Sequence, residues 1–250
     1  MEVLNPAGAG AAEWLPVVPG DLSRKLLEAA RRVRTDGPDR VVSLAAHLHG
    51  VDPCALAGDP ARIAFWVNVY NALFLHATSE RPLRLHLGLH TRLFRTAAYR
   101  VGAHEYALDT IEHALLRRNR RAYRRRKPVL GDDDDRLRAA PAHVDPRIHF
   151  ALNCGARSCP PIRAYEAASL DAQLRLATES YLVAEVDVDR PHGRVRLPGL
   201  MRLYGEDFGG PEEAIAFTAR HLPEPDAAWL VANAALVSVG YRRFDARVAS

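Results

Sequence analysis

Lysine, cysteine and long apolar runs are all scarce in this chain of 250 residues. Only Lys25 and Lys127 stand against 32 arginines, a bias that makes arginine richness a poor functional signal. Three cysteines are too few for a disulfide framework, and their odd number fits a reducing compartment with free thiols. No apolar run has the length of a membrane span, and the first residues lack the basic start and apolar stretch of a secretory signal. We therefore expect a cytoplasmic protein without a membrane partner.

The net charge of +4 raises the question of nucleic-acid binding. Most of the excess lies in residues 117–127, where eight of eleven residues are basic, and four consecutive aspartates follow at 132–135. Adjacent blocks of opposite sign are more typical of a solvated insertion than of a binding groove, and such aspartates are more often solvated than a cation site. The sequence thus disfavours nucleic acid and predicts neither a metal nor a cofactor. A small molecule or a peptide is left as the expected partner.

The periodicity of apolar residues predicts an α+β fold built on one buried helix. Residues 60–79 are apolar around nearly the whole circumference of a helix, which is typical of a central element. Amphipathic patterns over 21–34 and about 40–48 predict a helical N-terminal region, and residues 1–19 a loose lead-in. Further expected elements are hairpins over 96–106 and 185–197, helices over 170–183, 212–221 and 226–235, and a strand over 237–244. We expect a small antiparallel or mixed sheet packed on the central helix, with residues 1–59 and 60–245 in one compact unit.

The stretch from His149 to Pro161, with the sequence HFALNCGARSCPP, places two of the three cysteines beside a histidine and an asparagine. Residues 149–153 predict a short buried strand that a turn at 155–158 follows. Alternation along a strand would put His149 and Asn153 on one face and Cys154 on the other, with the apolar residues. Cys159 lies beyond the turn beside Arg157, whose guanidinium would favour a thiolate, so Cys159 is the better nucleophile candidate.

Five polar residues on two predicted helices complete the candidate site. Asn68 and Asn71 are three apart in the central helix, and a buried amide without a partner costs about 1–3 kcal/mol. They therefore either pin a loop, the role we favour about two to one, or face a substrate. Glu112 follows Asp109 by three residues, which predicts a capping box at a helix start. His113 and Arg117, four apart, share a helix face that is expected to meet the loop that carries Cys154 and Cys159.

Several of these motifs resemble the domain family DUF547. The resemblance rests on residues 64–73 (AFWVNVYNAL), 108–117 (LDTIEHALLR), 149–161 and 195–198, and on the later residues Tyr204, Asp207 and Phe208. It covers roughly residues 60–245, and the order of several long motifs makes it specific. The family has no settled activity, although relatives can be joined to thiol-redox domains. One departure is the segment 241–246, which lacks the tryptophan that commonly closes the family pattern.

The first functional hypothesis is a cysteine-dependent hydrolase or acyl transferase. Cys159 would be the nucleophile, with His149 or His113 as the base. An asparagine would orient the base, the candidates being Asn153, Asn68 and Asn71. Because Pro160 and Pro161 have no N–H, the amides of Ser158 and Cys159 would have to bind an oxyanion.

Two alternatives stay open beside catalysis. One is a thiol-redox or zinc site at Cys154 and Cys159, with His149 and Cys54 as further ligands, although the strand pattern would turn His149 and Cys154 apart. The other, of equal weight to catalysis, is a binding or scaffold domain whose motif residues hold a loop in place. Catalysis requires Cys159 in a cleft with a histidine, whereas a scaffold predicts satisfied polar groups and no pocket.

Overall fold

The computed structural model describes residues 1–6, 18–121 and 127–249. Its α-helices are α1 Pro19–Arg31, α2 Val33–Asp36, α3 Asp39–Ala46, α4 Gly58–Glu80, α5 Thr91–Thr96, α6 Leu170–Glu185, α7 Gly199–Leu203, α8 Pro211–Ala219 and α9 Asp226–Asn233. Its strands are β1 Glu2–Val3, β2 Ala97–Val101, β3 His104–Ala107, β4 Asp187–Asp189, β5 Arg194–Leu197 and β6 Ser238–Tyr241. One π-helix, η4 Thr110–Leu116, and short 3-10 helices such as η3 Leu87–Leu89 and η6 Pro146–Phe150 connect them.

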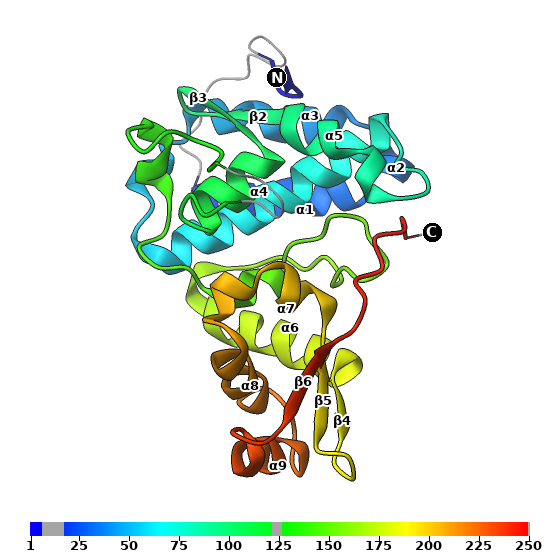
Figure 1. Ribbon diagram of the computed structural model, residues 1–250. Helices are drawn as coiled ribbons and strands as arrows, with labels where there is room; N and C mark the ends of the chain where they lie inside the picture. The colour runs from blue at the N-terminus through cyan, green and yellow to red at the C-terminus, as the bar shows by residue number, and fades with distance from the viewer. Residues whose placement is uncertain (7–17, 122–126, 250) are drawn as a thin grey trace.

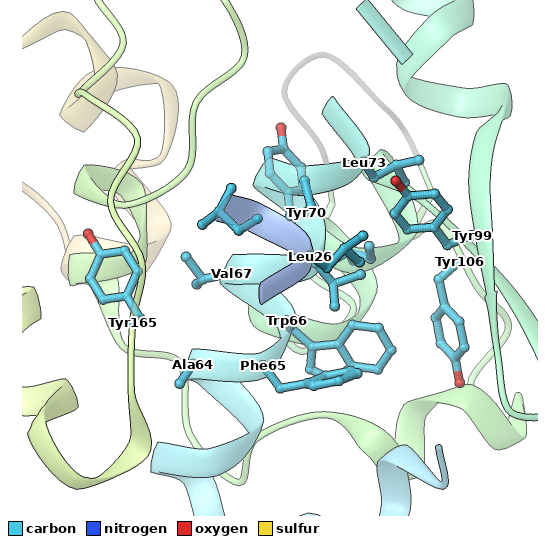
Figure 2. Packing of buried hydrophobic residues seen from close by; sticks show 14 of the residues in the cluster. Leu26, Ala64, Phe65, Trp66, Val67, Tyr70, Leu73, Tyr99, Tyr106 and Tyr165 are labelled. Carbon is cyan, nitrogen blue, oxygen red and sulfur yellow. The ribbon is translucent and has the colours of Figure 1, made fainter. Parts of the chain in front are cut away.

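Helix α4 is the centre of the first half of the chain. Every side chain from Ile63 to Phe74 is buried, because apolar residues cover all sides of the helix and leave no polar stripe for solvent. Leu26 of α1 and Tyr99 and Tyr106 of β2 and β3 pack around it (Figure 2). The predicted central helix and helical N-terminal region are therefore confirmed.

In the described ranges, two small three-stranded mixed sheets accompany the helices, so the predicted α+β fold is confirmed with two small sheets where one was expected. In the first, β1 pairs in parallel with β2, and β2 pairs with β3 in the antiparallel hairpin expected over 96–106. In the second, β4 and β5 form the other expected hairpin, and β6 adds in parallel to β5. Because β1 belongs to a sheet, the expectation of a loose lead-in is wrong for Glu2–Val3, while residues 7–17 lie outside the described ranges.

A second apolar cluster fills the half of the chain that follows the cysteine stretch. It joins Phe150 to residues of α6, β5, α7, α8 and α9. These helices and this strand lie together in the lower part of the molecule in Figure 1. The predicted helices over 170–183, 212–221 and 226–235 are confirmed as α6, α8 and α9. In the described ranges, no helix is long and apolar enough to cross a bilayer.

The segment after β6 connects the two halves. It runs from β6 back toward the first half, as the red trace in Figure 1 shows. The Leu87 N–H donates to Ala246 O at 2.9 Å, and the Arg157 N–H donates to Arg247 O at 2.9 Å. These bonds attach both η3 and the cysteine loop, residues 153–160, to the backbone of Ala246 and Arg247. The loop is thus held from both halves of the molecule.

Candidate functional site

Residues 146–150 form the 3-10 helix η6, so the strand predicted over 149–153 is wrong. The reason lies one residue upstream. The Asp145 carboxylate accepts the Arg147 N–H at 3.0 Å, and Pro146 follows as the first helical residue, a favourable start for a helical turn. A helical turn does not alternate its side chains between two faces, so the separation predicted for His149 and Cys154 does not occur. His149 and Cys154 consequently line one cavity instead of opposite faces.

That cavity, of about 300 Å³, lies where the two halves of the chain meet. Leucines and aromatic rings form much of its wall, including Leu152, Leu200 and Phe244. It brings together the three residues to which the sequence assigned catalytic roles, together with further polar side chains: Cys159, His149, His113, Cys154, Glu112, Ser158, Tyr70 and Tyr204. Asn68, Asn71, Asn153 and Arg117 lie outside the cavity lining.

The buried carboxylate of Asp207 organises one side of the cavity. It accepts His149 Nε2 at 2.7 Å, Arg117 Nε at 2.5 Å and Nη2 at 3.1 Å, and Arg120 Nη1 at 2.8 Å. Burial opposes the charge of Asp207, but the hydrogen bonds from His149 and Arg117 outweigh it and hold its pKa far below the usual range. Asp207 therefore stays ionised near neutral pH and acts only as a hydrogen-bond acceptor.

The Asp207 carboxylate next to Nε2 fixes the tautomer of the neutral His149 ring. Because a carboxylate can only accept, the proton of the neutral imidazole lies on Nε2 and the lone pair on Nδ1. The Tyr204 ring stacks on His149 with 3.9 Å between centroids, which holds the imidazole plane. His149 is thus a buried imidazole held in one orientation, and its hydrogen-bond partner is an aspartate and not one of the asparagines that the sequence suggested.

Glu112 accepts two phenolic hydroxyls. Tyr70 donates to its Oε2 at 3.1 Å and Tyr204 donates to its Oε1 at 2.7 Å. Burial opposes ionisation of Glu112, yet the neighbouring His113 and the hydrogen bond from Tyr204 leave its pKa lowered. Burial and the Glu112 charge in turn raise the pKa values of Tyr70 and Tyr204, so both phenols stay protonated donors.

The capping box predicted for Glu112 does not form. Asp109 makes no side-chain cap bond, and the residues after it wind as the π-helix η4, in which the Arg117 N–H donates to Glu112 O at 3.0 Å. A π-turn in place of an α-turn is frequent at functional sites. Here it lets Glu112 and His113 line the cavity while Arg117 reaches Asp207 behind it.

His113 is the second imidazole of the cavity. Arg117 Nη1 lies 3.1 Å from its Nδ1, and because a guanidinium has no acceptor, the neutral form of the ring carries its lone pair on Nδ1. The proton of neutral His113 is then on Nε2. In these tautomers His113 has its ring N–H at Nε2, whereas His149 has its unprotonated nitrogen at Nδ1.

The two thiols of the cysteine loop are in contact. Their Sγ atoms lie 2.7 Å apart, and Cys159 Sγ also accepts the Cys154 N–H at 3.2 Å. The hydrogen bond from the Cys154 thiol lowers the pKa of Cys159 against the opposing effect of burial, while the same bond raises that of Cys154. The thiolate therefore forms preferentially on Cys159, through Cys154 and not through Arg157 as the sequence suggested.

All three asparagines bond the backbone of loops. Asn68 pairs with both the N–H and the C=O of Tyr165, at 2.9 and 2.8 Å. Asn71 donates to Ala151 O at 2.9 Å and accepts the Asn153 N–H at 3.1 Å. The Asn153 side chain spans the cysteine loop, since it donates to Pro160 O and accepts the Gly155 N–H, each at 2.7 Å.

The backbone amides expected to bind an oxyanion already have partners. The Ser158 N–H donates to Asp245 O at 3.3 Å, and the Cys159 N–H donates to Ala156 O at 3.0 Å. Ser158 Oγ in turn accepts the Asp245 N–H at 2.9 Å. Other residues of the cavity lining that carry a hydroxyl or ring N–H include Tyr70, Tyr204 and His113, although both tyrosine hydroxyls donate to Glu112.

Arg117 is buried, so the solvated insertion predicted for residues 117–127 is wrong at its first residue. It is 2% exposed, and its guanidinium lies 4.9 Å from the centroid of the Tyr204 ring in addition to its bonds with Asp207. Residues 122–126 of that segment lie outside the described ranges. Asp134, one of the four aspartates, pairs with Arg136 at 2.7 Å.

Sequence reasoning assigned no role to Asp207, Tyr70 or Tyr204. Asp207 is 58 residues from His149 and 90 from Arg117, and no local spacing links such positions. The only available signal was their presence within the motifs that carry the family resemblance.

Comparison with known proteins places this chain in one family. The family model described as "Protein of unknown function, DUF547" matches residues 55–182, just over half of the chain. The chain belongs to the DUF547 family. Searches of curated proteins and of solved structures each gave no significant match. The match begins just before α4 and ends within α6, so it includes the cysteine loop but not Tyr204 or Asp207.

Proposed function

We propose that this protein is a cysteine-dependent hydrolase or acyl transferase. Cys159 is the nucleophile, His149 the base, and Asp207 the residue that orients His149. The observation that carries the proposal is the shared cavity, which both the half-buried Cys159 and the Asp207-bound His149 line. A scaffold domain would need no such cavity beside its thiol.

The proposed reaction begins as the Cys159 thiol gives its proton to His149 Nδ1. The thiolate then attacks the carbonyl carbon of an acyl donor, and His149 returns the proton to the leaving group. Asp207 stabilises the imidazolium that exists between these steps. Because Cys159 Sγ accepts its hydrogen bonds from Cys154, the thiol must turn across the cavity toward Nδ1 when substrate binds.

The hydroxyls of Tyr70 and Tyr204 and the ring of His113 are the proposed donors for the oxyanion. Since both phenols already donate to Glu112, one of them would redirect its proton as negative charge develops on the substrate. The leucines and aromatic rings of the cavity wall favour an acyl chain of low polarity.

Acylation by p-nitrophenyl acetate tests the proposal. We expect an acetyl group on the peptide that contains Cys159, formed faster than on Cys54, which lines a separate cavity. The variant His149→Gln keeps a donor for Asp207 but lacks a titratable base, and should acylate more slowly. Cys54→Ser is the matched control and should acylate as the native chain does. Acetyl groups spread evenly over the cysteines, or absent from Cys159, would refute a nucleophilic role.

A further inference from the structure

The contact between Cys154 and Cys159 is unusually close for two free thiols. Their sulfurs, 2.7 Å apart, lie within roughly 0.7 Å of the bonding distance of a disulfide, about 2.05 Å. Both residues are half-buried and line the cavity, where a small reagent can reach them. We propose that Cys154 and Cys159 are a modification site, at which a hydroperoxide forms a reversible disulfide that masks the thiol of Cys159.

Hydrogen bonds and packing fix the loop in the conformation in which the two sulfurs meet. The Asn153 side chain bonds both the start and the end of the loop, at Gly155 and Pro160. Gly155 has a φ of 82°, and a Cβ there would lie 2.8 Å from both Phe74 and Leu83, so the loop is packed against α4 and its following segment. The Tyr181 hydroxyl donates to Ser158 O at 2.7 Å from α6. The loop that brings the two sulfurs together is therefore anchored on both sides before any bond forms.

The chemistry divides between the two cysteines. The Cys159 thiolate attacks one oxygen of the hydroperoxide, the O–O bond breaks, and the alkoxide that leaves takes up a proton as an alcohol. Cys159 is then a sulfenic acid. The Cys154 sulfur attacks the Cys159 sulfur, the S–O bond breaks, and the departing hydroxide takes the Cys154 proton as water. Two thiols lose two electrons in total, and the hydroperoxide gains them.

The roles follow from the hydrogen bonds of the pair. Cys159 Sγ accepts the Cys154 N–H, so of the two sulfurs in contact Cys159 is the better placed to carry negative charge, with the Cys154 thiol as donor. Cys154, the donor, holds its proton until the sulfenic acid has formed. A disulfide would remove the nucleophile proposed above, and this loss of activity rests on the proposed function. Formation of the bond itself does not.

Mass spectrometry after treatment with hydrogen peroxide tests the inference. The native chain is oxidised with one equivalent, its remaining thiols are alkylated, and its peptides are mapped. We expect Cys154 and Cys159 to lose alkylation together, with a peptide mass lower by two hydrogens, and dithiothreitol to restore both. Cys54→Ser should behave in the same way. In Cys154→Ser, dimedone should instead capture a sulfenic acid on Cys159.

Three results would overturn the inference: independent alkylation of the two cysteines after oxidation, a bond that includes Cys54, or a sulfinic acid on Cys159 formed as fast in the native chain as in Cys154→Ser. None of these readouts depends on turnover. Failure of the disulfide with successful acylation of Cys159 would refute only the redox site. A disulfide without any acylation of Cys159 would refute only the proposed enzyme.

Discussion

Replacement of Asp207 by asparagine removes the charge on which one wall of the cavity depends. A neutral amide at this position cannot accept two arginines and an imidazole as a carboxylate does, and Arg117, 2% exposed, would remain as a buried cation. Breaking a buried ion pair by removal of one partner costs about 3–5 kcal/mol. For a chain of this size, each kcal/mol shifts Tm by roughly 2–4 °C, so we expect the Tm of Asp207→Asn to fall by about 6–20 °C.

The dependence of this loss on pH has a defined sign. The pKa of Asp207 is lowered in the folded chain, so its contribution to stability is complete above the unfolded value of about 3.9 and declines as pH falls below it. The difference in Tm between the native chain and the variant should therefore be constant from pH 7 to about pH 5 and shrink in stronger acid.

Calorimetry or circular dichroism over that pH range measures both effects. Asp187→Asn is the matched control, because Asp187 pairs with Arg196 at 2.9 Å while 37% and 65% of the two side chains are exposed. Such a surface pair contributes about 0–1 kcal/mol. If Asp207→Asn melted within the range of the Asp187→Asn control, Asp207 would not be the buried anchor described here.

Two further substitutions test the contacts that hold the site. Tyr204→Phe keeps the stacking on His149 but removes the donor to Glu112, a hydrogen bond to a charged group, and should lower the free energy of unfolding by about 1.5–3 kcal/mol. Urea titration should show a larger loss than for Tyr181→Phe, whose hydroxyl bonds the neutral Ser158 carbonyl, and an equal loss in both would contradict ionised Glu112. Asn71→Ala removes the hydrogen-bond partner of both Ala151 O and the Asn153 N–H. We therefore expect the free energy of unfolding to fall by about 2–5 kcal/mol and hydrogen exchange at residues 151–153 to become faster. Exchange at these residues unchanged from the native chain would mean that Asn71 does not pin the loop.

The elements predicted from sequence are those whose signal is local. Helix α4 followed from the apolar residues that cover nearly the whole circumference of a helix over residues 60–79, and both hairpins followed from alternation around a turn. Residues 149–153 were mistaken for a strand because a run of five apolar and polar residues fits either period. The Asp145–Pro146 pair, which favours a helical start, was the stronger signal.

The site could be predicted only as a set of residue types. Cys159, His149 and His113 were selected by chemistry and do line one cavity. Their partners come from distant parts of the chain, as Glu112 shows: its hydroxyl donors are 42 and 92 residues away, whereas the local spacing to Asp109 predicted a cap that does not form. Tertiary contacts of this kind override local propensity and leave no periodic trace in the sequence.

The alkylation rate of Cys159 as a function of pH tests the central claim most directly. Iodoacetamide labelling is followed by mass spectrometry for the native chain, His149→Gln and Cys154→Ala. We expect an apparent pKa for Cys159 below the roughly 8.5 of a free thiol, and a higher value in Cys154→Ala, where its hydrogen-bond donor is lost. In His149→Gln the apparent pKa should change less than in Cys154→Ala, because Cys159 Sγ contacts Cys154 and not His149 before substrate binds. If Cys159 titrates as a free thiol in all three proteins, or does not react, it is not the nucleophile of this cavity.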